Sequence, residues 1–172
     1  MRTMPTQRPG RSKQNYGTPN DFLAACYRKL DIDGFDVDLA ADRTNYVAPR
    51  WVSEKQNSLS LDWYALMVGA LDWLWLNPPY AHIAPWVQKA WQESQQGARI
   101  AVLIPASTGS NYWRDYVHHK AHVLLLNGRI TFVGQTNPYP KDCALLLYDQ
   151  TRADHDYEVW SWGTDKETVC RD

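Results

Sequence analysis

The stretch Asn77-Pro78-Pro79-Tyr80 contains the residue types needed to hold a planar molecule that carries an exocyclic amino group. The amide oxygen of Asn77 can accept one amino proton, and the carbonyl of Pro78 can accept the other. Pro78 biases Asn77 toward an extended backbone, and the Tyr80 ring can stack on a planar base. Two acceptors aimed at one NH2 group predict a pocket for methylating that group. The alternative is an ordinary Pro-Pro turn between a strand and a helix.

The apolar run 71–76 comes directly before this motif, and an amphipathic stretch follows it. This order predicts a buried strand that ends at Asn77, which would place the motif at the edge where open α/β sheets bind ligands. Apolar periodicity and turn residues predict further elements along the chain. The expected helices are 18–30, 83–95 and 111–120, and the expected strands are 35–41, 58–63 with Asp62 near its end, 71–76, 99–105, 121–126, 130–133 and 142–148. Alternating strands and helices predict a mostly parallel sheet, with an antiparallel edge formed by the late strands.

The length of 172 residues fits one domain, and 44% apolar residues are enough for a buried core. We expect the folded domain, which would carry the chemistry, at 18–149, a flexible basic arm at 1–17 and an acidic C-terminal extension at 150–172. A net charge of -1 gives no global signal for nucleic acid. The arm carries Arg2, Arg8, Arg11 and Lys13 and no acid, so it either contacts phosphates or is a disordered terminus without a role.

Neither a membrane span nor a metal site is expected. The longest apolar runs are far shorter than the roughly 20 residues of a spanning helix, and no apolar segment follows the basic N-terminus, so a cytoplasmic protein is predicted. Three scattered cysteines give neither a disulfide framework nor a zinc spacing. His118 and His122 have the i, i+4 spacing of a zinc site, but no third ligand lies at a supporting spacing.

Several segments taken in order resemble the phage-encoded DNA N-6-adenine methyltransferases, which are similar to Dam. They are Thr18-Pro19 with the following helix, 35–41, 61–63, the 77–80 motif with Pro85-Trp86 and Lys89-Ala90, 103–106, and 128–132. The resemblance covers about residues 17–149. It implies an abbreviated, Rossmann-like class I fold that uses S-adenosylmethionine and methylates N6 of an adenine flipped out of DNA.

The resemblance also implies roles for individual residues. Asn77, Pro78, Pro79 and Tyr80 would be catalytic, with Tyr80 and Trp86 against the substrate base. Asp38 would bind the methionine amino group or the ribose of the cofactor, and Asp62 its adenine amino group. The cofactor site would be completed by Ala40, Thr18, Pro19 and Asn77.

Alternatives remain for the substrate and for the activity. Cytosine N4 and a protein glutamine amide present the same NH2 chemistry as adenine N6. Many methyltransferases have glycines after the first strand, whereas Ala40-Ala41-Asp42 stands here. A catalytically degenerate module that binds DNA or cofactor is therefore the alternative from another class.

Overall fold

The computed structural model describes residues 16–69, 72–152 and 154–163. Its seven-stranded sheet has the order β2-β1-β3-β4-β6-β5-β7. The strands are β1 (Val37–Ala41), β2 (Arg50–Ser53), β3 (Leu74–Leu76), β4 (Ile100–Pro105), β5 (His122–Leu126), β6 (Cys143–Tyr148) and β7 (Tyr157–Trp160). Only β6 runs antiparallel, between β4 and β5, and the other pairings are parallel.

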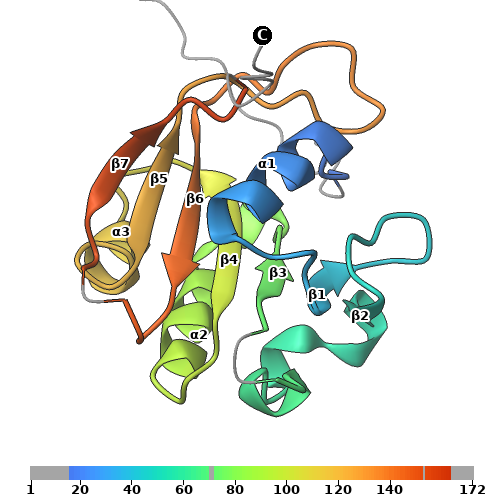
Figure 1. The fold of residues 1–172 in the computed structure, drawn as a ribbon, viewed down its shortest axis with the longest axis vertical. Helices are drawn as coiled ribbons and strands as arrows, with labels where there is room; N and C mark the ends of the chain where they lie inside the picture. The colour runs from blue at the N-terminus through green and yellow to red at the C-terminus, as the bar shows by residue number, and fades with distance from the viewer. Residues whose placement is uncertain (1–15, 70–71, 153, 164–172) are drawn as a thin grey trace, which may run out of the picture.

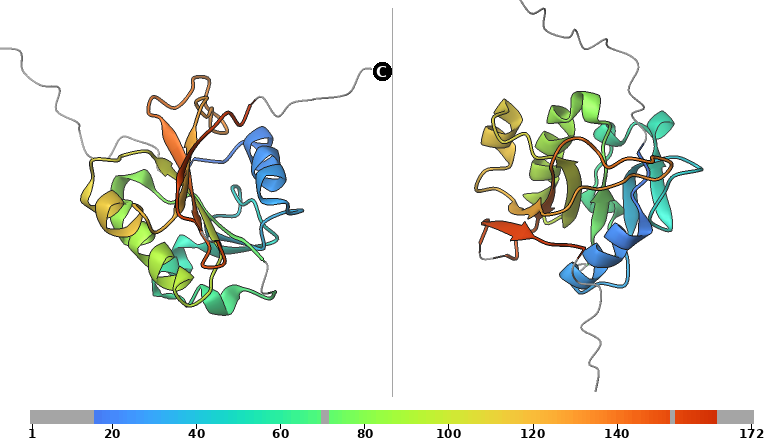
Figure 2. Two further views of the ribbon diagram at one scale, coloured as in Figure 1. Left: turned by 60° about the vertical axis from the view of Figure 1, so that its left-hand side comes forward. Right: turned by 90° about the horizontal axis from the view of Figure 1, so that it is seen from above.

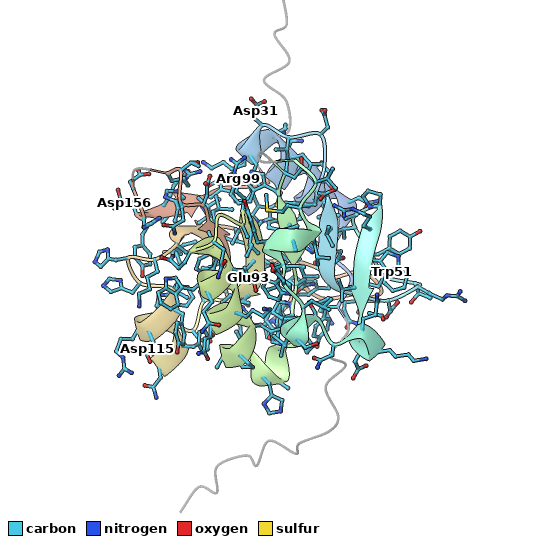
Figure 3. All side chains as sticks on the ribbon, turned by 90° about the horizontal axis from the view of Figure 1, so that it is seen from below. Asp31, Trp51, Glu93, Arg99, Asp115 and Asp156 are labelled. Carbon is cyan, nitrogen blue, oxygen red and sulfur yellow. The ribbon has the colours of Figure 1, made fainter. Side chains whose placement is uncertain are left out.

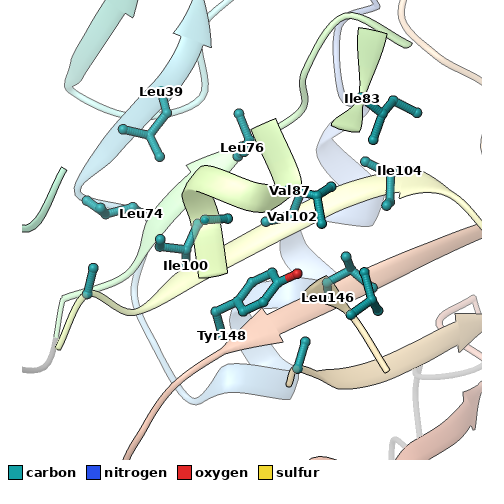
Figure 4. Close-up of a cluster of buried hydrophobic side chains, with 14 of the residues drawn as sticks. Leu39, Leu74, Leu76, Ile83, Val87, Ile100, Val102, Ile104, Leu146 and Tyr148 are labelled. Atoms are coloured by element: carbon teal, nitrogen blue, oxygen red, sulfur yellow. The ribbon is translucent and has the colours of Figure 1, made fainter. Parts of the chain in front are cut away.

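Helices cover both faces of the sheet, which gives three layers (Figures 1 and 2). The helix α1 (Asn20–Leu30) packs Phe22 and Cys26 on one face, against Trp75, Leu103 and Leu145. The helices α2 (Ala84–Ser94) and α3 (Asn111–Tyr116) cover the other face. The core of that second face, shown in Figure 4, consists of apolar side chains from every second strand position together with Val87. This alternation follows from the two-residue period of a strand.

The predicted helices 18–30 and 83–95 are confirmed within two residues at each end. The predicted helix 111–120 is confirmed at its start but ends at Tyr116. The strands at 35–41, 71–76, 99–105, 121–126 and 142–148 are also confirmed, although some are shorter than expected. Two strands were not predicted. β2 lies in the segment 42–56, to which no element was assigned, and β7 lies in the expected C-terminal extension, where it pairs with β5.

The prediction of an antiparallel edge was wrong. The antiparallel strand β6 lies inside the sheet, and the edges are β2 and β7. The crossover through α3 leaves a gap of one strand between β4 and β5. β6 fills this gap and pairs with both strands. All six residues of β6 are buried, which is the pattern of a central strand.

Two further predicted strands are absent from the described part of the chain. Residues 58–63 form the 3-10 turn η2 (Ser58–Ser60) and a loop, because the Ser60 hydroxyl and the Trp63 indole donate hydrogen bonds to nearby carbonyls of residues 57 and 58. In 130–133 only an isolated bridge forms, between Gly17 and Val133.

The loop that contains Trp63 is fastened to α2 by a buried carboxylate. One oxygen of Glu93 accepts hydrogen bonds from the backbone N–H groups of Trp63 and Tyr64, each at 3.0 Å. Its other oxygen pairs with Lys89 at 2.5 Å. Figure 3, which views the molecule from below, labels Glu93 near its centre. No helix within the described ranges is long and apolar enough to cross a membrane.

Candidate active site

The candidate site lies at the carboxyl edge of the parallel strands, at the top of the sheet in Figure 1. β1 ends at Ala41, β3 at Leu76 and β4 at Pro105, so the residues that follow them meet at one edge. Asn77 is the first residue after β3. Pro78 is buried and Pro79 is exposed, and the short 3-10 helix η4 (Tyr80–His82) follows.

Hydrogen bonds fix the orientation of the Asn77 amide. Its Nδ2 donates to the carbonyl oxygen of Tyr16 at 2.8 Å and to the hydroxyl of Thr18 at 3.2 Å. A carbonyl oxygen is only an acceptor, so the atom facing Tyr16 must be the NH2 group. Oδ1 is therefore the amide atom left to accept a hydrogen bond from a bound molecule.

The segment that holds this amide is itself held by two loops. The N–H of Val133 donates to the carbonyl of Gly17 at 2.9 Å. A Cβ atom on Gly17 would lie 2.9 Å from the Cβ of Val133 and 3.0 Å from Oδ1 of Asn45, so glycine permits the close approach. Residues 16–18 thus lie between the loop after β1 and the loop after β5.

Four aromatic rings form a cluster at the end of the 77–80 motif: Tyr16, Tyr80, Phe132 and Tyr139. Every pair among them is in contact, with ring centroids 5.1–6.1 Å apart. The Tyr80 hydroxyl points toward the carbonyl of Leu103 at 3.4 Å, which is a long hydrogen bond. Burial raises the pKa of Tyr80 well above its ordinary value, so this phenol stays neutral and supplies a ring surface rather than a base.

A cavity of about 540 Å³ opens beside Tyr80. Tyr139 and Lys141 from the loop after β5 line it, together with Pro105 and Ser107 at the end of β4 and residues at the start of α2. Its volume lies in the usual range for small-molecule pockets. Tyr139 was not singled out from the sequence, and its place between two prolines offered no functional signal.

Asp38 is 4% exposed, and backbone groups hold its carboxylate. Its oxygens accept hydrogen bonds from the N–H of Ala40 at 3.2 Å and from that of Val47 at 3.1 Å. Burial raises the pKa of Asp38 to about 6, and the two backbone hydrogen bonds lower it only in part. This carboxylate therefore has no positive partner among the described residues.

The structure brings together some of the predicted site residues and not others. Thr18 contacts Asn77, and Pro19 precedes α1 directly after it. Trp86 stacks on Trp63 with centroids 6.4 Å apart and does not line the cavity. Asp62 is exposed and accepts a hydrogen bond from the N–H of Ala65 at 2.9 Å, so it caps a turn instead of ending a strand.

The histidines have local partners. His118 Nδ1 lies 3.0 Å from the Tyr157 hydroxyl, and His122 Nε2 lies 3.6 Å from a Glu158 oxygen. The residues of the described ranges include no group of three or more His, Cys, Asp or Glu side chains that could hold a metal ion.

The end of β3 thus places the Asn77 amide, with Oδ1 left as an acceptor, at the carboxyl edge of a mostly parallel sheet, which is where open α/β sheets bind ligands. The model of the DNA N-6-adenine-methyltransferase (Dam) family matches residues 6–156. The chain therefore belongs to this family, and the resemblance noted in the sequence is confirmed.

Two similar phage proteins extend this finding. Over 142 residues the chain is 25% identical to a DNA N-6-adenine-methyltransferase of Escherichia phage T1. The aligned region covers 83% of this chain and 57% of the relative. Over 122 residues it is 28% identical to a DNA N-6-adenine-methyltransferase of Haemophilus phage HP1 (strain HP1c1), covering 67% of each. The match thus spans little more than half of the T1 protein.

Proposed function

We propose that this protein transfers a methyl group from S-adenosylmethionine to N6 of an adenine in DNA, in the cytoplasm of the host cell. Membership of the Dam family is the observation that carries the proposal. The orientation of the Asn77 amide supports it, because Oδ1 is left to accept from the substrate amino group. In this proposal the sheet is an abbreviated form of the class I methyltransferase fold.

The adenine amino nitrogen is a poor nucleophile because its lone pair is delocalised into the ring. Asn77 Oδ1 and the carbonyl of Pro78 would accept its two protons, which favours a tetrahedral nitrogen and stabilises the positive charge that develops. Pro79 would keep the turn rigid. A base inside a duplex cannot reach this edge, so it must flip out, at a cost of a few kcal/mol. The flipped base would lie against Tyr80, which lines the 540 Å³ cavity; Asn77 and Pro78 themselves are not among the residues that line the cavity.

The chemistry of the edge near β1 fits the cofactor, which supplies an activated methyl group when bound. The buried Asp38 carboxylate without a positive partner suits the methionine ammonium. Ala40 and Thr18 with Pro19 would form neighbouring walls. Asp62 is retained as a candidate for the cofactor adenine and Trp86 as one for the substrate base, although neither contacts Asn77 in the described hydrogen bonds and ring contacts.

The residues 1–15 of the basic arm lie outside the described residues. We infer that the arm contacts DNA phosphates without reading sequence, since phosphate contacts position a protein but carry no direct sequence information. The domain at 18–149 would carry the chemistry.

The decisive experiment incubates the purified protein with isotopically labelled S-adenosylmethionine and unmethylated DNA, and then identifies the labelled nucleoside by mass spectrometry. N6-methyladenine is the expected product. N4-methylcytosine, or label on protein glutamine, would assign the chemistry to another amino group. Cofactor or DNA binding without any transfer would identify a degenerate binding module.

The affinity for S-adenosylmethionine is predicted to depend on the ionisation of Asp38. An ammonium binds the carboxylate, and the pKa of Asp38 lies at about 6, so the carboxylate is ionised above that pH and protonated below it. Calorimetry should show affinity that is highest near about pH 7, where the Asp38 carboxylate and the cofactor ammonium are both charged, and that falls up to about tenfold per pH unit below 6.

The matched variants for this measurement are Asp38→Asn and Asp36→Asn. The first should bind the cofactor at least about tenfold more weakly at pH 7.5 and should lose the pH dependence. Asp36, which directly precedes β1, instead forms an ion pair with Arg50 of the neighbouring strand β2, so its variant should behave as the wild type. Equal affinity of the wild type and Asp38→Asn would remove Asp38 from the cofactor site.

Replacing Tyr80 should separate ring stacking from hydroxyl chemistry. Tyr80→Ala is expected to lower kcat/KM on DNA by the fold-change that corresponds to about 1–3 kcal/mol of lost binding free energy, because this is the usual contribution of stacking on one base. Tyr80→Phe should keep most of the activity, because the hydroxyl makes only the 3.4 Å contact with Leu103. Tyr64→Ala, at an exposed ring elsewhere, is the control. A Phe variant as inactive as the Ala variant would assign the role to the hydroxyl.

A further inference from the structure

The long loop between β5 and β6, residues 127–142, lies at the same edge of the sheet as Asn77 (orange in Figure 1). Its two stems are firmly attached to the fold. The side chain of Asn127 donates to Ser161 at 3.0 Å, and the Trp162 indole donates to the carbonyl of Gly128 at 2.9 Å. The backbone N–H of Tyr139 donates to Ile130 across the loop at 2.8 Å.

The loop is also joined to the catalytic motif. Phe132 is 2% exposed, and its ring contacts those of Tyr80 and Tyr139. The N–H of Val133 is bonded to Gly17, next to the residues that hold the Asn77 amide. The distance between a base beside Tyr80 and the side chains at the tip of the loop would therefore be fixed.

The tip, residues 133–138, is exposed and has a definite turn. The N–H of Gln135 donates to the carbonyl of Phe132 at 3.0 Å, and Gly134 has a φ of 76°, which glycine adopts readily. The side chains of Gln135, Thr136 and Asn137 take part in no hydrogen bond within the described ranges. The polar side chains of the tip are thus displayed outward from a fixed base.

Charge and residue type indicate what this tip contacts. The loop 127–142 carries two bases, Arg129 and Lys141, and one acid, Asp142, which pairs with Arg129 at 3.4 Å. Lys141 is in no ion pair of the described ranges, so it is the positive side chain of the loop that can attract a phosphate. Lys141 also lines the cavity beside Tyr80. Gln and Asn amides can form paired hydrogen bonds with the edge of adenine, and Thr can donate or accept at several bases.

We propose that the tip reads the base edges that flank the target adenine, with Gln135 and Asn137 as the specificity-determining residues. This inference rests on the proposed function, because the flanking bases are defined only once the adenine is bound. It places sequence recognition on a loop tied to the catalytic motif.

The test compares the wild type with Gln135→Ala, Asn137→Ala and the double variant on DNA of randomised sequence. Sequencing that detects N6-methyladenine gives the preference at each flanking position. We expect each single variant to lose at least about tenfold of the preference at one position, as removal of a bidentate contact does. The affinity for S-adenosylmethionine and the thermal stability should stay unchanged, since the tip is exposed.

Gln96→Ala is the matched control, because Gln96 is exposed and follows α2 at the opposite edge of the sheet. It should methylate the same sites as the wild type. Unchanged preferences in the double variant would overturn the inference while leaving the proposed function intact, and so would a wild type that methylates adenines without flanking preference. Absence of methyl transfer by the wild type would instead refute the proposed function.

Discussion

Asn77→Ala is expected to lower kcat for DNA methylation roughly 30- to 1,000-fold. This fold-change corresponds to an increase of about 2–4 kcal/mol in the activation free energy, which is the usual cost of removing one well-placed transition-state hydrogen bond. The reason is that Oδ1 would accept from an amino group that becomes positive only as the methyl group is transferred. The ground state gains less from this acceptor, so KM should change less than kcat. Single-turnover methyl transfer measures the effect directly.

The same variant should bind S-adenosylmethionine within a few-fold of the wild-type affinity in calorimetry. Thr18→Val is a graded companion: it removes the 3.2 Å contact to Nδ2 and leaves the 2.8 Å contact with the Tyr16 carbonyl. Its kcat should fall only a few-fold, because one anchor still orients the amide. Near-normal turnover of Asn77→Ala would show that the acceptor lies elsewhere.

The position of the 77–80 motif could be predicted because the signal is local. An apolar run that ends in Asn-Pro-Pro-Tyr indicates both the strand and the edge where it ends, and β3 does end at Leu76. The contact of Thr18 with Asn77 joins residues 59 positions apart. Periodicity carries no information about such a pair, and only the resemblance to a family placed Thr18 near the site.

The two strands that were predicted but do not form, at 58–63 and 130–133, fail because side chains there make contacts that a strand would not allow. Residues 58–63 alternate enough to suggest a strand, but serine and tryptophan side chains bind nearby carbonyls, and Glu93, 30 residues away from Trp63, holds the result in place. Residues 130–133 have the composition of a strand, yet the Phe132 ring packs in the aromatic cluster around Tyr80. Side-chain packing at the site therefore outweighs strand propensity there.

Asn77→Asp should be active only where the new carboxyl group is protonated. Many pockets for amino groups could use a carboxylate, because both of its oxygens accept. Here, however, the atom that replaces Nδ2 would face the Tyr16 carbonyl oxygen at about the present 2.8 Å. The Thr18 hydroxyl can turn to donate to a carboxylate, but the carbonyl cannot. An ionised side chain would suffer repulsion between two oxygens, whereas a protonated one can donate to Tyr16 and still accept from the substrate.

Repulsion and partial burial both disfavour the charged form, so the pKa of the introduced carboxyl is raised above that of an ordinary Asp. The protonated, active form is then present below that raised pKa and is lost as the pH increases through it. We expect kcat of the variant to be at least about tenfold below the wild type at pH 8, and the ratio of the two kcat values to rise as the pH is lowered toward 5.5. Taking the ratio at each pH cancels titrations common to both proteins. A ratio that stays constant with pH, or a variant with full activity at pH 8, would mean that Nδ2 of Asn77 does not face the Tyr16 carbonyl during catalysis.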